Sequence, residues 1–170
     1  QDGREDIFIA NGHIDDWSSQ GDLHHMPAQL FQFEGPRFAE CSSTGGEFFR
    51  RKSLGRGVAC GDYDNDGDWD LTVVHQNSPT ALLRNDSVRG HWLKLRFIAK
   101  TNRRGIGVQV VLQQGTRTLK QQLVGGNSYC SAHDPSIIFG LGDDATPCEL
   151  EIHWPDGSRQ RVPRTVLNST

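Results

Sequence analysis

Five aspartates stand at alternate positions in a nine-residue stretch, Asp62-Tyr63-Asp64-Asn65-Asp66-Gly67-Asp68-Trp69-Asp70. Two carboxylates about 4 Å apart repel by roughly 4 kcal/mol at an effective dielectric of about 20, so this many in one turn need a cation among them. A hard divalent ion that accepts six to eight oxygens suits such a cage, which favours Ca²⁺ over the stricter Mg²⁺. A solvated acidic turn without a metal is the alternative.

The spacing reproduces the first nine positions of a calcium loop. Side chains at positions 1, 3, 5 and 9 and the carbonyl at position 7 would bind the ion, and a glycine at position 6 allows the sharp turn. The predicted metal ligands are therefore Asp62, Asp64, Asp66, Asp70 and, through its carbonyl, Asp68.

The segments on either side of the loop exclude an EF-hand. Position 12 of an EF-hand is a bidentate Glu, whereas the twelfth residue here is Val73. The segments 57–61 and 71–75 are small or β-branched and lack helical periodicity, so both are predicted to be strands. The sequence therefore predicts a calcium loop between two β-strands.

The composition favours an all-β protein and argues against two classes of partner. A net charge of −3 without a basic run argues against nucleic acid. No apolar stretch approaches the ~20 residues that span a bilayer, and no signal peptide is recognised at the start. The 19 glycines and the short alternating segments point to strands and turns.

The first residues repeat the central loop. Residues 2–9 align with residues 66–73 through a shared Asp-Gly-x-x-Asp pattern followed by an apolar strand, which places Gln1 at position 4 of a truncated loop. This copy keeps only Asp2 and Asp6 as ligands, so we expect metal binding there to be weak or absent. An internal repeat is stronger sequence evidence for a fold than the other patterns in this chain, and it indicates a repeat architecture.

Further strands are predicted on both sides of a polar boundary at residues 85–90. In the first part a long polar loop, residues 11–27, contains His13, His24 and His25, which we interpret as surface histidines rather than zinc ligands. After the boundary, six short strands suggest a small β-sandwich or open barrel. The strands predicted outside the central pair are residues 6–10, 29–33, 37–41, 81–84, 91–99, 107–113, 118–124, 136–141, 149–154 and 159–162.

Two resemblances follow from these motifs. Residues 2–13 and 61–71 resemble FG-GAP/VCBS repeats, which form blades of β-propellers and bind calcium through the loop positions named above. About 85 residues would make roughly two blades, too few for a closed ring. The resemblance implies that residues 1–86 are terminal propeller repeats.

The second part resembles the ASPIC/UnbV domain of the cartilage acidic protein-like family. The matching motifs are Gly90-His91-Trp92-Leu93, Asn102-Arg103-Arg104-Gly105-Ile106-Gly107, Gly125-Gly126-Asn127-Ser128-Tyr129, Phe139-Gly140-Leu141-Gly142 and Trp154-Pro155-Asp156-Gly157. Their order implies an ASPIC/UnbV β-domain over residues 87–170. In that family such a domain usually follows FG-GAP/VCBS repeats.

The sequence contains no clear catalytic motif. No Gly-x-Ser-x-Gly elbow occurs, and the paired carboxylates are those that a metal would neutralise. Catalytic residues are therefore not predicted. Four tryptophans could stack on sugar rings; we expect Trp92 and Trp154 in the core, and Trp17 and Trp69 at the surface.

The four cysteines, Cys41, Cys60, Cys130 and Cys148, lack the spacing of a metal site. Their even number and the calcium loop favour a secreted, cell-surface or periplasmic protein. A disulfide between Cys130 and Cys148 would close a loop of about 18 residues and add roughly 3 kcal/mol, with two buried thiols as the alternative. Asn85 and Asn168 are glycosylation acceptors if the source is eukaryotic.

These observations predict a non-catalytic, extracellular calcium-binding module that recognises a protein, matrix or glycan ligand. An accessory protein or calcium-dependent enzyme of a biosynthetic or polysaccharide-degrading pathway is the alternative. Large apolar side chains of the first part need cover, which the second part, another copy of the chain or further propeller blades would supply. These side chains are Phe8, Phe31, Phe33, Phe48 and Phe49.

Overall fold

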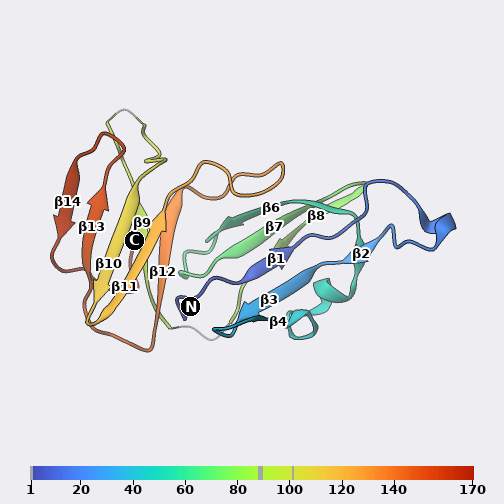
Figure 1. The fold of residues 1–170 in the computed structure, drawn as a ribbon, viewed down its shortest axis with the longest axis horizontal. Coiled ribbons are helices and arrows are strands. Elements are labelled where there is room, and N and C mark those ends of the chain that lie inside the picture. The colour runs from blue at the N-terminus through green and yellow to red at the C-terminus, as the bar shows by residue number, and fades with distance from the viewer. Residues whose placement is uncertain (1, 88–89, 101) are drawn as a thin grey trace.

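A computed structural model describes residues 2–87, 90–100 and 102–170, and confirms the predicted all-β fold. Strands alternate with turns, and the only helical segments among the described residues are three short 3-10 turns. No helix in these ranges is long and apolar enough to cross a membrane. The two parts lie at opposite ends of the long axis (Figure 1).

The first part consists of three small antiparallel sheets, with strand orders β1-β3-β4, β2-β5 and β6-β7-β8. Its strands are β1 (Ile7–Ile9), β2 (Met26–Pro27), β3 (Gln29–Phe33), β4 (Phe38–Glu40), β5 (Lys52–Ser53), β6 (Gly55–Gly61), β7 (Asp70–His75) and β8 (Ser78–Leu83). The 3-10 turns are η1 (Ser18–Gln20), η2 (Ser42–Thr44) and η3 (Glu47–Arg50). Strands β6 and β7 are the predicted pair around the acidic loop.

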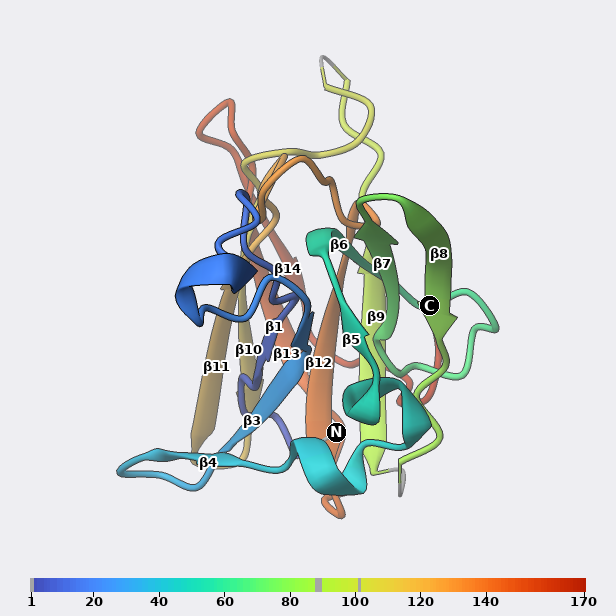
Figure 2. The ribbon, with the colours of Figure 1, turned by 90° about the vertical axis from the view of Figure 1, so that its right-hand side faces the viewer.

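The second part is a two-layer sandwich, as predicted. Strands β9 (His91–Arg96) and β12 (Ser136–Gly142) form one sheet. The other sheet has the order β11-β10-β13-β14, with β10 (Gln109–Gln114), β11 (Arg117–Gln122), β13 (Glu149–His153) and β14 (Arg159–Val162). In Figure 2 the first part faces the viewer, with β9 and β12 behind it.

The main hydrophobic core lies between the two sheets of the second part. Alternate residues of the strands face inward, as the period of two requires. The core consists of Leu93, Phe97, Val108, Val110, Leu112, Leu123, Ile137, Phe139, Leu141, Cys148, Leu150 and Ile152. Trp154 packs against this core and meets Phe97 edge to face, as expected for a core tryptophan.

The first part has a much thinner interior. Its buried apolar side chains are Ala28, Leu54, Val58 and Val73. The predicted cover for its aromatic side chains is partly local, because Phe8 packs against Phe48 and Phe49. These rings are only half-buried.

One expectation, on the cysteines, needs correction. All four cysteines are free; Cys148 is buried in the core while Cys130 is exposed, so the Cys130–Cys148 disulfide prediction is wrong. The described sheets of the first part have two or three strands and do not close into a propeller, in agreement with the expectation that about two blades are too few for a ring. Gln1, and Val88 and Arg89 at the predicted boundary, lie outside the described residues.

Candidate metal centre

The acidic stretch forms the connection between β6 and β7, whose ends pair at Gly61 and Asp70. Carboxylate oxygens of Asp62, Asp64 and Asp70 all lie within 4.8 Å of one another. Asp62 and Asp70 are only 5% and 2% exposed, whereas Asp64 is exposed to solvent. The fold thus brings together three of the predicted ligands at positions 1, 3 and 9.

Main-chain N–H groups of the loop hold the first carboxylate in place. The Asp66 N–H donates to Oδ1 of Asp62 over 3.0 Å, and the Gly67 N–H donates to Oδ2 over 3.2 Å. The turn requires a left-handed backbone at Gly67, where φ is +88°. The sequence therefore shapes its own acidic cage through local hydrogen bonds.

The Asp70 carboxylate connects the start of the loop to a segment that lies later in the sequence. Oδ2 of Asp70 accepts the Tyr63 N–H over 3.0 Å, and Oδ1 accepts the Asn85 N–H over 2.9 Å. Asp70 thereby fixes the start of the loop and the segment that follows β8. Its position at the beginning of β7 keeps it almost fully buried.

Asp66 and Asp68 do not belong to the three-carboxylate group. Oδ1 of Asp66 accepts the Asp68 N–H over 2.9 Å, and the Asp68 side chain is 2% exposed. Metal coordination by the Asp66 side chain and by the Asp68 carbonyl stays a prediction.

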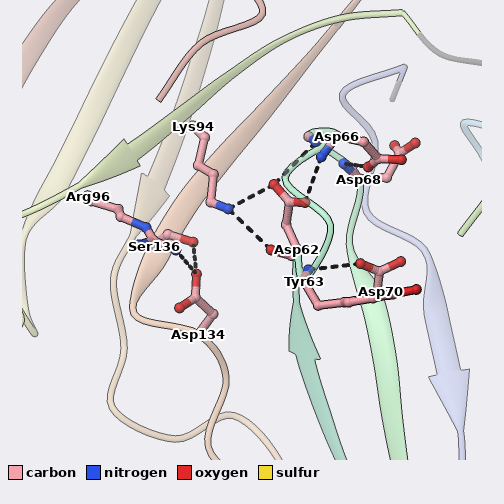
Figure 3. Close-up of polar contacts among 10 residues, drawn as sticks. Asp62, Tyr63, Asp66, Asp68, Asp70, Lys94, Arg96, Asp134 and Ser136 are labelled. Carbon is pink, nitrogen blue, oxygen red and sulfur yellow. Dashed lines mark hydrogen bonds and ion pairs between the residues drawn. The ribbon is translucent and has the colours of Figure 1, made fainter. Parts of the chain in front are cut away.

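A buried lysine from the second part reaches the loop. The Lys94 side chain is fully buried, and its Nζ donates to Oδ2 of Asp62 over 2.8 Å (Figure 3). Sequence reasoning missed this residue because an alternating strand with a lysine is usually interpreted as having one solvated face. In this structure β9 is covered on both faces, by the core and by the loop.

The indole of Trp92 also lies at the contact between the acidic loop and the second part. A Cβ at Gly67 would lie only 2.2 Å from Cδ2 of Trp92, so glycine permits the close approach of the ring. Trp92 is half-buried and lies two residues before Lys94, on the same face of β9. The expected core position of Trp92 is therefore an interface position.

A shallow cavity of about 380 Å³ opens beside the loop. Its lining joins the loop to the second part and consists of Asp66, Gly90, His91, Trp92, Gly142, Asp143 and Asn168. Oδ1 of Asn168 accepts the Trp92 N–H over 3.1 Å, and its Nδ2 lies 3.2 Å from Nδ1 of His91. The cavity thus combines an aromatic ring with polar groups that can bind hydroxyls.

The donor set fits a hard divalent cation. Three carboxylates supply oxygen ligands, which Ca²⁺ and Mg²⁺ prefer to nitrogen or sulfur. The Lys94 ammonium leaves part of the negative charge of the group unbalanced, since it is a single charge against three. Residues Asp62, Asp64 and Asp70 would hold the ion.

The other residues that the sequence predicts at the surface or in the truncated repeat do not belong to the three-carboxylate group. Oδ1 of Asp6 in the truncated repeat accepts the Phe33 N–H over 3.0 Å. His24 and His25 stack edge to face at 4.9 Å, and within the described ranges no metal-ligand group includes a histidine. Trp17 is 42% exposed, as expected, whereas Trp69 is half-buried.

Comparison with known proteins supports the identification of the second part. Residues 98–170 match the family model of ASPIC and UnbV. Cartilage acidic protein 1 of Xenopus tropicalis is 32% identical over 108 residues, which cover 61% of this chain and 16% of that protein. The human and mouse proteins of that name are each 29% identical over 128 residues, covering 72% of this chain and 19% of theirs.

The family model identifies residues 98–170 as an ASPIC/UnbV domain. The similarity to cartilage acidic protein 1 is distant and extends beyond these residues. The chain spans less than a fifth of the length of these relatives. Strand β9 precedes the matched residues, yet it pairs with β12 along the sheet.

Proposed function

From this ASPIC/UnbV domain and the adjoining acidic loop, we propose that the chain is a non-catalytic, extracellular calcium-binding module. The observation that carries the proposal is the convergence of Asp62, Asp64 and Asp70 in one loop between two strands. Calcium is favoured because the loop spacing offers two further oxygen ligands, from Asp66 and the Asp68 carbonyl. In this proposal the ion stiffens the loop against the second part.

The cavity beside the loop is the proposed ligand site. Trp92, Asn168 and Asp143 offer an aromatic surface, an amide and an exposed carboxylate, a combination suited to sugar hydroxyls or to a polar segment of a protein. The loop forms one wall through Asp66, so calcium binding would order that wall. A matrix protein or glycan is therefore the proposed class of ligand.

The first part would pack against further propeller blades or another copy of the chain. Ile7, Ile9 and Phe38 of its sheets are each at least 39% exposed, and such apolar side chains are typical of surfaces that pack on a neighbour. FG-GAP/VCBS repeats stack as propeller blades, and the resemblance of residues 2–13 and 61–71 to these repeats supports the same arrangement. We propose that further blades or another copy of the chain cover these residues.

Thermal unfolding tests the calcium proposal. A ligand that binds only the native state adds about 2.7 kcal/mol at one hundred times its dissociation constant. For a protein of this size, that gain raises the melting temperature by about 5–10 °C. We expect Ca²⁺ to produce this rise over chelator, and Asp64→Asn to abolish it.

Asp64 is the most informative residue to substitute because it is exposed and belongs to the carboxylate group. Asp62 and Asp70 also accept hydrogen bonds from main-chain N–H groups, so their substitution would disturb the loop itself. Asp22→Asn, at an exposed site in the first part, is the matched control and should keep the full rise. Identical melting curves in calcium and in chelator would refute the proposal. Turnover of a substrate that Asp64→Asn removes would contradict the non-catalytic role.

A further inference from the structure

Lys94 is a charged residue in an unusual place. Among the described residues it is the largest side chain with no exposed surface. A buried ammonium is costly unless a charged partner and hydrogen bonds compensate it. Its partners belong to a single residue, since Nζ lies 2.8 Å from Oδ2 and 3.5 Å from the main-chain oxygen of Asp62.

The lysine and the carboxylate come from different parts of the molecule. Lys94 lies on β9 of the sandwich, and Asp62 is the first residue of the acidic loop. Trp92 from the same strand lies against Gly67 of that loop. The ammonium therefore stays at the loop for as long as the two parts remain packed together.

We infer that Lys94 is an internal cation that weakens metal binding at the loop and replaces part of the metal's stabilising role when no metal is bound. This inference rests on the proposed function, because it concerns the affinity of the proposed calcium site. It assigns to the second part a direct influence on a metal site that lies in the first.

Two opposing effects decide whether Lys94 strengthens or weakens metal binding. Lys94 could strengthen metal binding by orienting Asp62, and loss of such an outer partner typically costs about 10–100-fold in affinity. However, two N–H groups, from Asp66 and Gly67, already hold the Asp62 carboxylate. The orienting contribution of Lys94 is therefore partly redundant.

Charge repulsion is the larger effect. A divalent ion and an ammonium that share one carboxylate would lie about 5 Å apart, and at an effective dielectric of about 20 their repulsion corresponds to on the order of 10⁵-fold in affinity. Screening by solvent and relaxation of the protein reduce this repulsion. Even a large reduction leaves its effect on affinity greater than the gain from orienting Asp62. Removing the charge should therefore tighten metal binding by at least about tenfold.

The metal-free protein should respond in the opposite direction. Without Lys94, Asp62 would be a buried carboxylate next to Asp70, which is also buried, and no ammonium would compensate either. Breaking a buried pair from one side is strongly destabilising for this reason. The variant's stability should therefore depend on the metal far more than that of the wild type.

The experiment compares the wild type with Lys94→Met and Lys94→Gln, and uses Lys120→Met as the control. Lys120 lies exposed on β11, so its variant carries the same change in net charge away from the loop. Calorimetry with calcium chloride measures affinity, and melting curves in calcium and in chelator measure stability. These readouts need no knowledge of the biological ligand.

We expect the two Lys94 variants to bind calcium at least tenfold more tightly, to melt earlier in chelator, and to gain more from calcium than the wild type. A variant that folds only with calcium would be the extreme form of this result. Equal or weaker affinity, or failure to fold with and without calcium, would overturn the inference. If the wild type itself bound no calcium, the proposed function would fail first, and the two failures are therefore distinguishable.

Discussion

The four thiols occupy distinct environments, and this determines their chemistry. Burial raises the pKa of Cys60 and of Cys148, and burial together with the nearby Asp6 carboxylate raises that of Cys41. Cys130 is exposed, in a backbone conformation with φ of +50°. Because the thiolate is the reactive form, a raised pKa slows reaction at neutral pH, and burial blocks access as well.

Thiol labelling of the native protein should therefore modify Cys130 well before the other three cysteines. A colorimetric disulfide reagent at neutral pH should give one fast equivalent, and Cys130→Ser should remove it. Cys148→Ser serves as the control and should leave the fast equivalent in place. Two fast equivalents in the wild type would contradict the assigned burial.

At the scale of elements, the segment before β12 docks on β6 of the first part. The Cys60 N–H donates to Nδ1 of His133 over 3.0 Å, and the Asp134 N–H donates to the Cys60 carbonyl over 2.8 Å. Burial lowers the pKa of His133 below its usual 6.5. The ring is therefore neutral at pH 7, which leaves Nδ1 free to accept the Cys60 N–H.

This contact predicts a loss of stability in mild acid. The depressed pKa of His133 means that the unfolded chain takes up the proton first, so the stabilising contribution is complete above pH 6.5 and declines as the pH falls towards the folded-state pKa. Melting temperatures between pH 8 and 5 should fall less steeply for His133→Gln than for the wild type. His25→Gln, at an exposed histidine, should keep the wild-type slope.

The elements show how far local pattern determines structure. Strands β3 and β14 have the predicted bounds, because Gly and Pro turn residues flank both of them. The acidic loop was equally predictable, because its geometry follows from contacts within nine residues. Strands β2 and β5, two residues each, carry no periodic signal and arise from pairing across 25 residues of chain.

Lys94 could not be predicted for a related reason. A lysine in an alternating strand indicates a solvated face, and nothing local shows that another part of the chain covers it. The partner of Lys94, Asp62, lies 32 residues earlier in the sequence. Packing between the two parts, rather than strand propensity, converts this surface position into a buried ion pair.

At the scale of the whole molecule, apolar burial is strongly uneven. The contiguous core lies within the sandwich, whereas the first part buries only a few apolar side chains of its own. Each large apolar side chain contributes about 1.5–3 kcal/mol when buried. The second part should therefore hold most of the folding free energy.

Separate expression of residues 88–170 and 1–87 tests this division. We expect a dispersed heteronuclear NMR spectrum from residues 88–170, because both core sheets remain intact. Residues 1–87 should give a collapsed spectrum, since they bury few apolar side chains of their own and their acidic loop loses Lys94. A dispersed monomeric spectrum from residues 1–87 alone would show that the opposite division holds.

Because the core lies in the second part, the acidic loop is synthesised before the sandwich that positions Lys94. A ribosome adds about 5–20 residues per second, so the roughly 60 residues between the end of β8 and the end of β12 take about 3–12 s to appear. Lys94 lies on β9, which pairs with β12, so the lysine has no fixed place beside Asp62 until β12 has been made. If the loop binds a metal ion as proposed, an ion bound during that interval would reach the Asp62 carboxylate before the lysine does.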